Sequence, residues 1–350
     1  MVKPSSRRTL KFVSAVCLAG LLTGCGRGPR IGPLVTADPN APPTPTPFGP
    51  FGSVSVELPA LAPLAGTPLV SIAGTWGDFP GPSEPSAIEI PPPMPPIPMP
   101  PNSINIILLG SDRRPGFYGS RTDTIMIVSL DSSAGTVRLL SLPRDLYVYI
   151  PGWTVNRINT ADQHGGPELV ALTLLYNLGI EAHHWVRVSF NGFITAVNLL
   201  DGIDIQVERS IEDECDERPV LFSAGLQHMN GYTALCYARV RKSSSDFERI
   251  KRQQQVLVAV FERVLTLDGL SKVPQLYEQF GELAETDMDL GDILPLVPLA
   301  ATVAGDSSRI EHYSIDRTLV TSWRVPSSGA QVLLPNREEI QAYLLQAFAP

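Results

Sequence analysis

Residues 184–208, HWVRVSFNGFITAVNLLDGIDIQVE, contain one complete strand–helix–strand unit. Residues 184–190 are predicted as a strand, 191–202 as a helix that ends at Asp-Gly, and 203–208 as a second strand. Strands that alternate with helices pack as a sheet covered by helices. The stretch therefore predicts an α/β fold.

The same alternation continues on both sides of this unit. Residues 104–110 form a continuous apolar run that ends in glycine, as a buried central strand does. We further predict a hairpin over 124–131 and 136–142, a strand near 309–313, and helices over 166–179, 230–241, 246–267, 273–302 and from about 337. Residues 102–350 are thus expected to form one domain, an α-β-α sandwich with a mixed central sheet.

The first 25 residues have the pattern of a bacterial lipoprotein signal peptide. Basic residues precede the apolar run 12–22, which is shorter than the about 20 residues of a membrane-spanning helix. The run leads into LTGC (22–25), where such signals are cut before the cysteine and the thiol receives a lipid. An ordinary signal peptide is the alternative. We expect Cys25 to anchor the mature protein to the outer face of the cytoplasmic membrane.

Residues 26–101 hold most of the chain's 34 prolines. Because proline lacks a backbone donor and has a fixed φ, this segment is predicted to be an extended spacer between the lipid and the domain.

Besides the lipidated Cys25, the predicted mature chain has two cysteines, Cys215 and Cys236. In an oxidising compartment two thiols predict one disulfide, and a free buried Cys236 is the alternative.

The formal net charge of −8 argues against general nucleic-acid binding, which requires a broad basic surface. Residues 237–257, YARVRKSSSDFERIKRQQQVL, nevertheless concentrate basic side chains. In a helix Asp246, Arg249 and Gln253 share one sector with the apolar stripe, so these polar groups should face inward. Asp246 cannot balance Arg249 together with Arg239 and Arg241, and a diphosphate would supply the missing charge.

Two further polar clusters follow predicted strands, at the sheet edge where ligands of α/β proteins bind. Asp112 and Asp123 flank Arg121 after the first strand, and Arg144 and Asp145 follow the third. Carboxylates hold Mg²⁺, or Mn²⁺, against phosphate oxygens. We therefore predict Asp112 and Asp123 as metal ligands.

Five segments in order resemble the LytR–CpsA–Psr family over residues 103–265: LLGSDRR…SRTDTIMIVSLD, SLPRDLYVYIPG, RINTADQHGGPELV, VSFNGFITAVNLLDGIDIQV and the basic stretch 237–257. The resemblance implies that family's α/β fold and transfer of a glycopolymer from a polyprenyl diphosphate carrier to peptidoglycan outside the membrane. By position, Asp112 and Asp123 match its metal ligands, and Arg144 and Asp246 match further site residues. Its diphosphate-binding residues correspond to Arg121, Arg239, Arg241, Arg249 and Gln253.

The resemblance also implies an apolar pocket for the lipid tail, for which residues 170–180 and 193–200 are candidates. Family members are commonly held by a transmembrane helix, whereas this chain is expected to use a lipid and a proline-rich spacer. The acidic segment 211–219 would repel an anionic polymer if it lined the entrance.

The expected reaction is attack of an acceptor hydroxyl on the anomeric carbon, with lipid diphosphate leaving. Metal and arginines would stabilise the leaving group, and Asp145 or Asp246 would take the proton of the acceptor. The alternatives are a phosphohydrolase with water as acceptor, and a non-catalytic polyprenyl-lipid-binding regulator.

Overall fold

The computed structural model describes residues 63–70, 78–112, 121–241, 246–266, 273–281 and 283–348, which belong to one compact unit. The predicted signal peptide with Cys25, and the predicted spacer up to residue 62, lie outside these residues. Within the described part of the chain, no helix has the length and apolar character needed to cross a bilayer.

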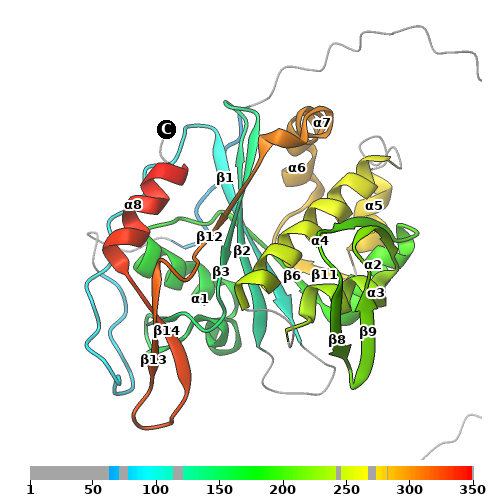
Figure 1. Cartoon of the computed structure of the whole chain (residues 1–350). Helices are drawn as coiled ribbons and strands as arrows, with labels where there is room; N and C mark the ends of the chain where they lie inside the picture. Colours follow the sequence, from blue (N-terminus) through cyan, green and yellow to red (C-terminus); the bar gives the residue numbers. More distant parts are fainter. Residues whose placement is uncertain are drawn as a thin grey trace, which may run out of the picture. The chain divides into compact units, whose positions relative to one another are not determined.

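A six-stranded mixed sheet lies at the centre, in the order β11-β6-β1-β2-β3-β12 (Figure 1). Its strands are β1 (Ser103–Ser111), β2 (Thr122–Asp131), β3 (Thr136–Leu142), β6 (His184–Ser189), β11 (Ala284–Thr286) and β12 (Ile310–Ser314). The neighbours β1–β6 and β3–β12 are parallel, whereas β1–β2, β2–β3 and β6–β11 are antiparallel. The predicted mixed sheet is confirmed.

Helices cover both faces of the sheet (Figure 1). On one face lie α1 (Ala161–Leu178) and α8 (Arg337–Phe348), which share a core with Ile107, Ile127 and Leu140 of the central strands. On the other lie α2 (Phe190–Leu199), α3 (Gly231–Arg239) and α4 (Asp246–Thr266). The sheet is therefore the middle layer of the predicted α-β-α sandwich.

Most of the short strands outside the central sheet were not predicted, although β7 is the strand predicted over 203–208. Four two-stranded sheets are formed by β4 (Tyr147–Tyr149) with β5 (Val155–Arg157), β7 (Ile203–Val207) with β10 (Gly225–Met229), β8 (Ile211–Cys215) with β9 (Arg218–Phe222), and β13 (Val320–Arg324) with β14 (Gln331–Pro335). The region predicted as helix over 273–302 consists of α5 (Val273–Phe280), β11, α6 (Leu290–Ile293), a short 3₁₀ turn (Leu294–Leu296) and α7 (Val297–Gly305). The helix prediction is wrong at β11, because those residues pair with β6 at the edge of the sheet.

Part of the proline-rich segment packs on the domain. Residues 78–101 form no helix or strand, as their composition predicts. Met94 and Ile97 are nevertheless buried in the main core, and their backbone N–H groups donate to the carbonyls of Tyr176 and Gly179, both at 2.8 Å. The folded unit thus starts before residue 102, and the predicted free spacer up to residue 101 is wrong for this part of the chain.

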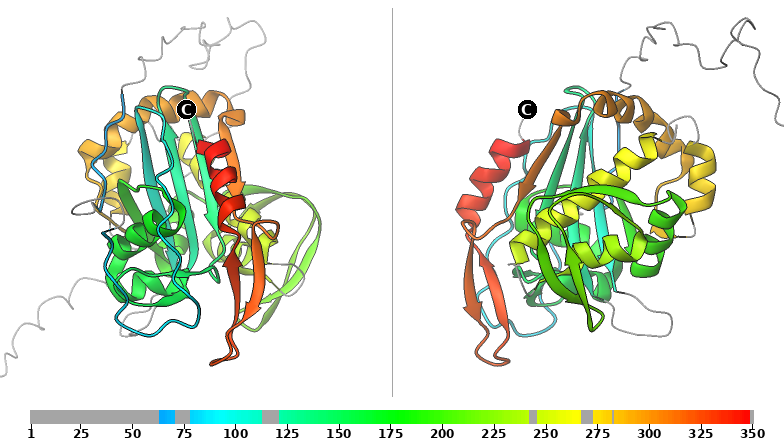
Figure 2. Two further views of the ribbon diagram at one scale, coloured as in Figure 1. Left: turned by 90° about the vertical axis from the view of Figure 1, so that its left-hand side faces the viewer. Right: turned by 45° about the vertical axis from the view of Figure 1, so that its right-hand side comes forward.

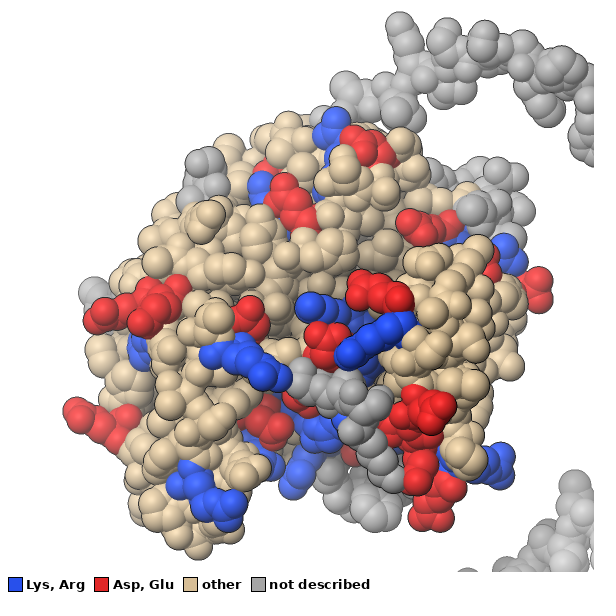
Figure 3. Space-filling model, in the orientation of Figure 1, with Lys and Arg blue, Asp and Glu red and all other residues tan. Residues whose placement is uncertain are grey.

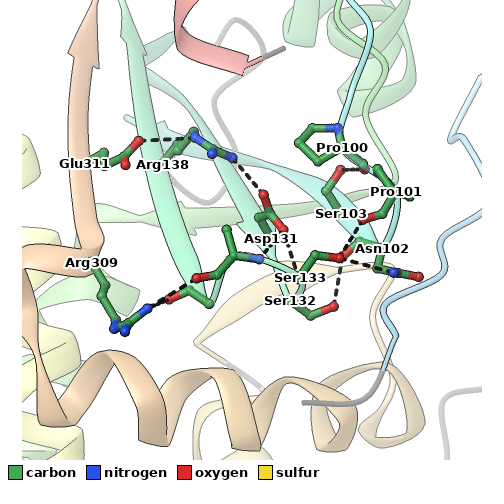
Figure 4. A network of polar contacts seen from close by, with 12 residues as sticks. Pro100, Pro101, Asn102, Ser103, Asp131, Ser132, Ser133, Arg138, Arg309 and Glu311 are labelled. Atoms are coloured by element: carbon green, nitrogen blue, oxygen red, sulfur yellow. Dashed lines mark hydrogen bonds and ion pairs between the residues drawn. The ribbon is translucent and has the colours of Figure 1, made fainter. Parts of the chain in front are cut away.

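A polar network fixes the last prolines to the β2–β3 turn (Figure 4). The Ser133 hydroxyl donates to the carbonyl of Pro101 at 3.1 Å, and the Ser132 hydroxyl donates to the carbonyl of Asn102 at 3.0 Å. Asp131 accepts from the backbone N–H of Ser133 at 3.0 Å and forms an ion pair with Arg138 at 3.2 Å. Because the buried Asp131 and Ser132 both find partners, these contacts fix the position in which the chain enters β1.

Candidate functional site

A cavity of about 430 Å³ lies between the sheet and helices α2, α3 and α4. Its depth is apolar, with side chains from every wall, among them Leu108, Met126, Phe193, Leu235, Val256 and Val260. Its polar lining residues include Asp112, Asp123, Arg144, Arg239, Arg241, Arg249 and Gln253. Figure 3 shows basic and acidic side chains side by side around a hollow in the face viewed in Figure 1.

Arg249 comes from the inner face of α4, as the helical periodicity predicts. Its side chain is only 4% exposed and forms an ion pair with Asp246 at 2.9 Å. Its Nε is buried and has no hydrogen-bond partner among the described residues. Burial lowers the pKa of Arg249 to about 10, and the positive charges of Arg241 and Arg144 act in the same direction. The guanidinium is therefore short of negative charge.

Asp246 forms ion pairs with two arginines. One carboxylate oxygen lies 2.8 Å from Arg241, and the other lies 2.9 Å from Arg249. Asp246 itself does not line the cavity. Its role in this structure is to hold both guanidinium groups at the cavity wall.

Arg239, near the end of α3, contacts a hairpin that sequence reasoning did not connect to the site. Asp216 lies in the β8–β9 turn and forms an ion pair with Arg239 at 3.2 Å. The predicted disulfide between Cys215 and Cys236 is confirmed, with a Cα–Cα distance of 5.6 Å, and it ties this turn to α3. The acidic segment 211–219 is thus held next to a site arginine.

The carboxylates at the strand ends lie at the same mouth. Asp123 forms an ion pair with Arg144 at 2.6 Å through Oδ2, whereas its Oδ1 is buried and has no hydrogen-bond partner among the described residues. Burial alone would lower the pKa of Arg144, but the charge of Asp123 and the hydrogen bond to it raise that pKa. Asp112 accepts a hydrogen bond from the backbone N–H of Arg121 at 2.8 Å.

These two carboxylates are suitable ligands for a divalent cation, and the partnerless Oδ1 of Asp123 is an available donor atom. No group of three or more His, Cys, Asp or Glu side chains among the described residues has metal-site geometry. A cation bound here would need further oxygen ligands, and Mg²⁺ usually takes these from water and phosphate.

Two predicted site residues do not line the cavity. Arg121 lines a second pocket instead, although its backbone N–H donates to Asp112. Asp145 lies between Arg144, at 3.6 Å, and Arg157, at 3.1 Å, and does not line the cavity either.

Of the two segments predicted to line a tail pocket, only 193–200 does so, through Phe193, Ala196 and Val197. Residues 170–180 do not. They belong to α1, which packs in the core on the opposite face of the sheet, so that prediction is wrong.

One basic residue of the cluster has a structural role. Arg252 is as buried as Arg249, at 4% exposure, but its guanidinium donates to the carbonyls of Tyr237 at 3.1 Å and Val240 at 2.6 Å. These carbonyls lie at the C-terminal end of α3, where helices leave acceptors without intrahelical partners. Arg252 therefore joins α4 to α3, whereas Arg249 faces the cavity.

An α/β domain whose cavity has an apolar depth and an arginine-rich mouth is suited to bind an anionic amphiphile. The chain belongs to the LytR_cpsA_psr family, whose model matches residues 93–346. Regulatory protein MsrR of Staphylococcus aureus is 36% identical over 176 residues, which are 49% of this chain and 53% of that protein. Polyisoprenyl-teichoic acid–peptidoglycan teichoic acid transferase TagV of Bacillus subtilis is 33% identical over 184 residues, 50% of this chain and 47% of TagV. The chain thus spans about half the length of these curated relatives.

Solved structures agree with the fold. The crystal structure of B. subtilis TagV has a TM-score of 0.60 and 28% identity, and covers 71% of this chain and 98% of that chain. A structure described as TagT bound to LIIa-WTA has a TM-score of 0.56 and 25% identity, and covers 70% of this chain and 89% of that chain.

Proposed function

We propose that this protein transfers a glycopolymer from a polyprenyl diphosphate carrier to peptidoglycan, or to another acceptor of the cell envelope. The observation that carries the proposal is the cavity itself, in which an apolar depth continues into a mouth lined by Arg144, Arg239, Arg241 and Arg249. A polyprenyl diphosphate has the same two parts, an apolar chain and a compact anionic group. The name of TagV and the ligand described for TagT support the same class of reaction.

The arginines would bind and orient the diphosphate. Guanidinium groups make paired hydrogen bonds to phosphate oxygens, and these bonds strengthen as charge develops on the leaving group. The positive charge of Arg249 is poorly compensated, because the side chain is buried, lacks a partner at Nε and lies near Arg241 and Arg144. Binding of the donor would supply that negative charge.

We propose that Asp112 and Asp123 hold Mg²⁺ or Mn²⁺ when the donor is bound. The ion would neutralise diphosphate charge that the two carboxylates would otherwise repel. The buried Asp123 Oδ1, which has no partner among the described residues, supports this assignment.

In the transfer an acceptor hydroxyl gives its proton to a carboxylate, for which Asp145 and Asp246 are the candidates. If the acceptor oxygen bonds to the anomeric carbon, the sugar–oxygen bond breaks and lipid diphosphate leaves. If it bonds to the phosphorus next to the sugar, the diphosphate bridge breaks and lipid monophosphate leaves. The lipid product therefore identifies the bond that breaks.

The test incubates a labelled glycan–polyprenyl diphosphate and Mg²⁺ with and without soluble peptidoglycan fragments. We expect label to become covalently attached to the fragments, and to remain on the lipid when the metal is chelated or with Asp123→Ala. Release of label only as free sugar or sugar phosphate, whatever the acceptor, would identify a hydrolase instead. A donor that binds tightly but is never cleaved would indicate a lipid-binding regulator.

We also propose that the protein acts outside the cytoplasmic membrane, anchored by a lipid on Cys25. The LTGC motif that follows an apolar run supports this location.

A further inference from the structure

A second pocket, of about 640 Å³, is lined by Arg157, an ion-pair partner of Asp145. Its walls are the β4–β5 hairpin, the loop between β13 and β14, and residues 85–87 of the proline-rich segment. We propose that this pocket binds the glycan chain of the acceptor; the inference rests on the transferase function proposed above.

The lining of the pocket is suited to a sugar. Asn156, Thr160, Ser327 and Ser328 offer neutral hydrogen-bonding groups, and the largely buried Tyr147 borders the pocket. The volume lies within the range of about 300–1,000 Å³ found for small-ligand sites. Neutral hydrogen-bonding side chains of this kind bind the hydroxyls of pyranose rings.

The positive charge of the pocket favours anionic glycans over neutral ones. Arg121 and Arg157 line it, and none of the described residues that line it is acidic. An anionic glycan that carries carboxylates, as the peptide-substituted sugars of peptidoglycan do, matches this charge better than a neutral one.

The walls of the pocket are held in place by hydrogen bonds between residues that are far apart in the sequence. The Thr154 hydroxyl donates to the carbonyl of Pro85 at 2.9 Å, and Arg157 donates to the carbonyl of Gln331 at 2.7 Å. Phe79 and Trp323 pack against the same buried cluster, so the proline-rich segment lies near the β13–β14 hairpin (Figure 2). The pocket is thus formed before any ligand binds.

Asp145 connects the two pockets through its ion pairs. Asp145 forms ion pairs with Arg157, which lines the second pocket, and with Arg144, which lines the cavity. A sugar hydroxyl that projects toward Asp145 would therefore approach the donor. Residues 85–87 lie outside the family match of 93–346, so this wall would adapt the chain to its own acceptor.

The test fills the pocket without touching the charged residues. Ser327→Trp places a large side chain in the exposed loop that lines the pocket, and Ser322→Trp is the matched control, since Ser322 is exposed on the same hairpin but does not line it. Binding of uncrosslinked peptidoglycan fragments, and of chitin tetrasaccharide as a neutral probe, is measured by calorimetry. Binding of the donor lipid is measured in parallel.

We expect Ser327→Trp to weaken fragment binding at least tenfold, with donor binding unchanged and with Ser322→Trp like wild type. The neutral probe should bind wild type more weakly than the fragments. Equal fragment binding by both variants would overturn the inference, and if wild type still transfers label, the proposed function survives. If the wild type transfers no label, but Ser327→Trp still weakens fragment binding relative to the wild type, the pocket is a glycan-binding site and the proposed transferase function is wrong.

Discussion

Replacing Arg249 with methionine should stabilise the protein without ligand while it destroys the donor site. Burial lowers the pKa of Arg249 to about 10, so the charged form is disfavoured in the folded state. At about 1.4 kcal/mol per pKa unit, this penalty is on the order of 3 kcal/mol. Methionine has a similar length and no charge, and Asp246 keeps its partner Arg241.

The measurement is the free energy of unfolding in urea, without ligand and near pH 7. We expect Arg249→Met to raise it by about 1–3 kcal/mol, because part of the gain is offset by imperfect packing of the new side chain. Addition of a polyprenyl diphosphate should raise the melting temperature of the wild type but not that of the variant.

Arg252→Met is the matched control, since Arg252 is equally buried on the same helix. Its removal leaves two backbone carbonyls without their donors, so the free energy of unfolding should fall by about 1–3 kcal/mol. Changes of opposite sign in the free energy of unfolding, at two equally buried arginines, cannot come from burial alone. A loss of stability in both variants would refute the reasoning, because Arg249 would then be adequately paired without a ligand.

Three further predictions concern other parts of the molecule. Arg249→Lys retains a charge but loses paired hydrogen bonds, so donor turnover should fall at least tenfold, about 1.4 kcal/mol; near-normal turnover would contradict this. Cys25→Ser should abolish fatty-acid labelling and leave the precursor uncleaved, and persistent label would place the lipid elsewhere. Burial lowers the pKa of His183 below 6.5, so the unfolded chain takes up a proton first and stability should fall as pH drops below about 6.5; His183→Gln should flatten the melting temperature between pH 7 and 5.5.

The site on α4 could be predicted because its information is local. Residues 246–266 carry an apolar stripe, and helix geometry alone places Arg249 and Gln253 on the inner side. The strand β1 likewise contains a continuous apolar run; Asp112 follows it directly, and Asp123 lies at the start of β2. In each of these cases the relevant neighbours lie within a few residues in the sequence.

What could not be predicted depends on long-range pairing. Asp216 reaches Arg239 only because β8 and β9 pair and the disulfide holds their turn against α3. Helices α1 and α2 are both apolar, and composition does not reveal which face of the sheet each one covers. Arg121 lines the second pocket, whose walls come from three distant parts of the chain.

The position of Asp145 bears on which carboxylate accepts the proton. Both oxygens of Asp246 are engaged at close range by Arg241 and Arg249, on the donor side of the site. Asp145 is held by Arg157 at 3.1 Å but lies 3.6 Å from Arg144, so its second oxygen is the less tightly paired one. Its backbone carbonyl accepts from the N–H of Leu333, which fixes it against the hairpin that forms the second pocket. If that pocket holds the acceptor, Asp145 is the better placed general base, because its two ion-pair partners line the two pockets.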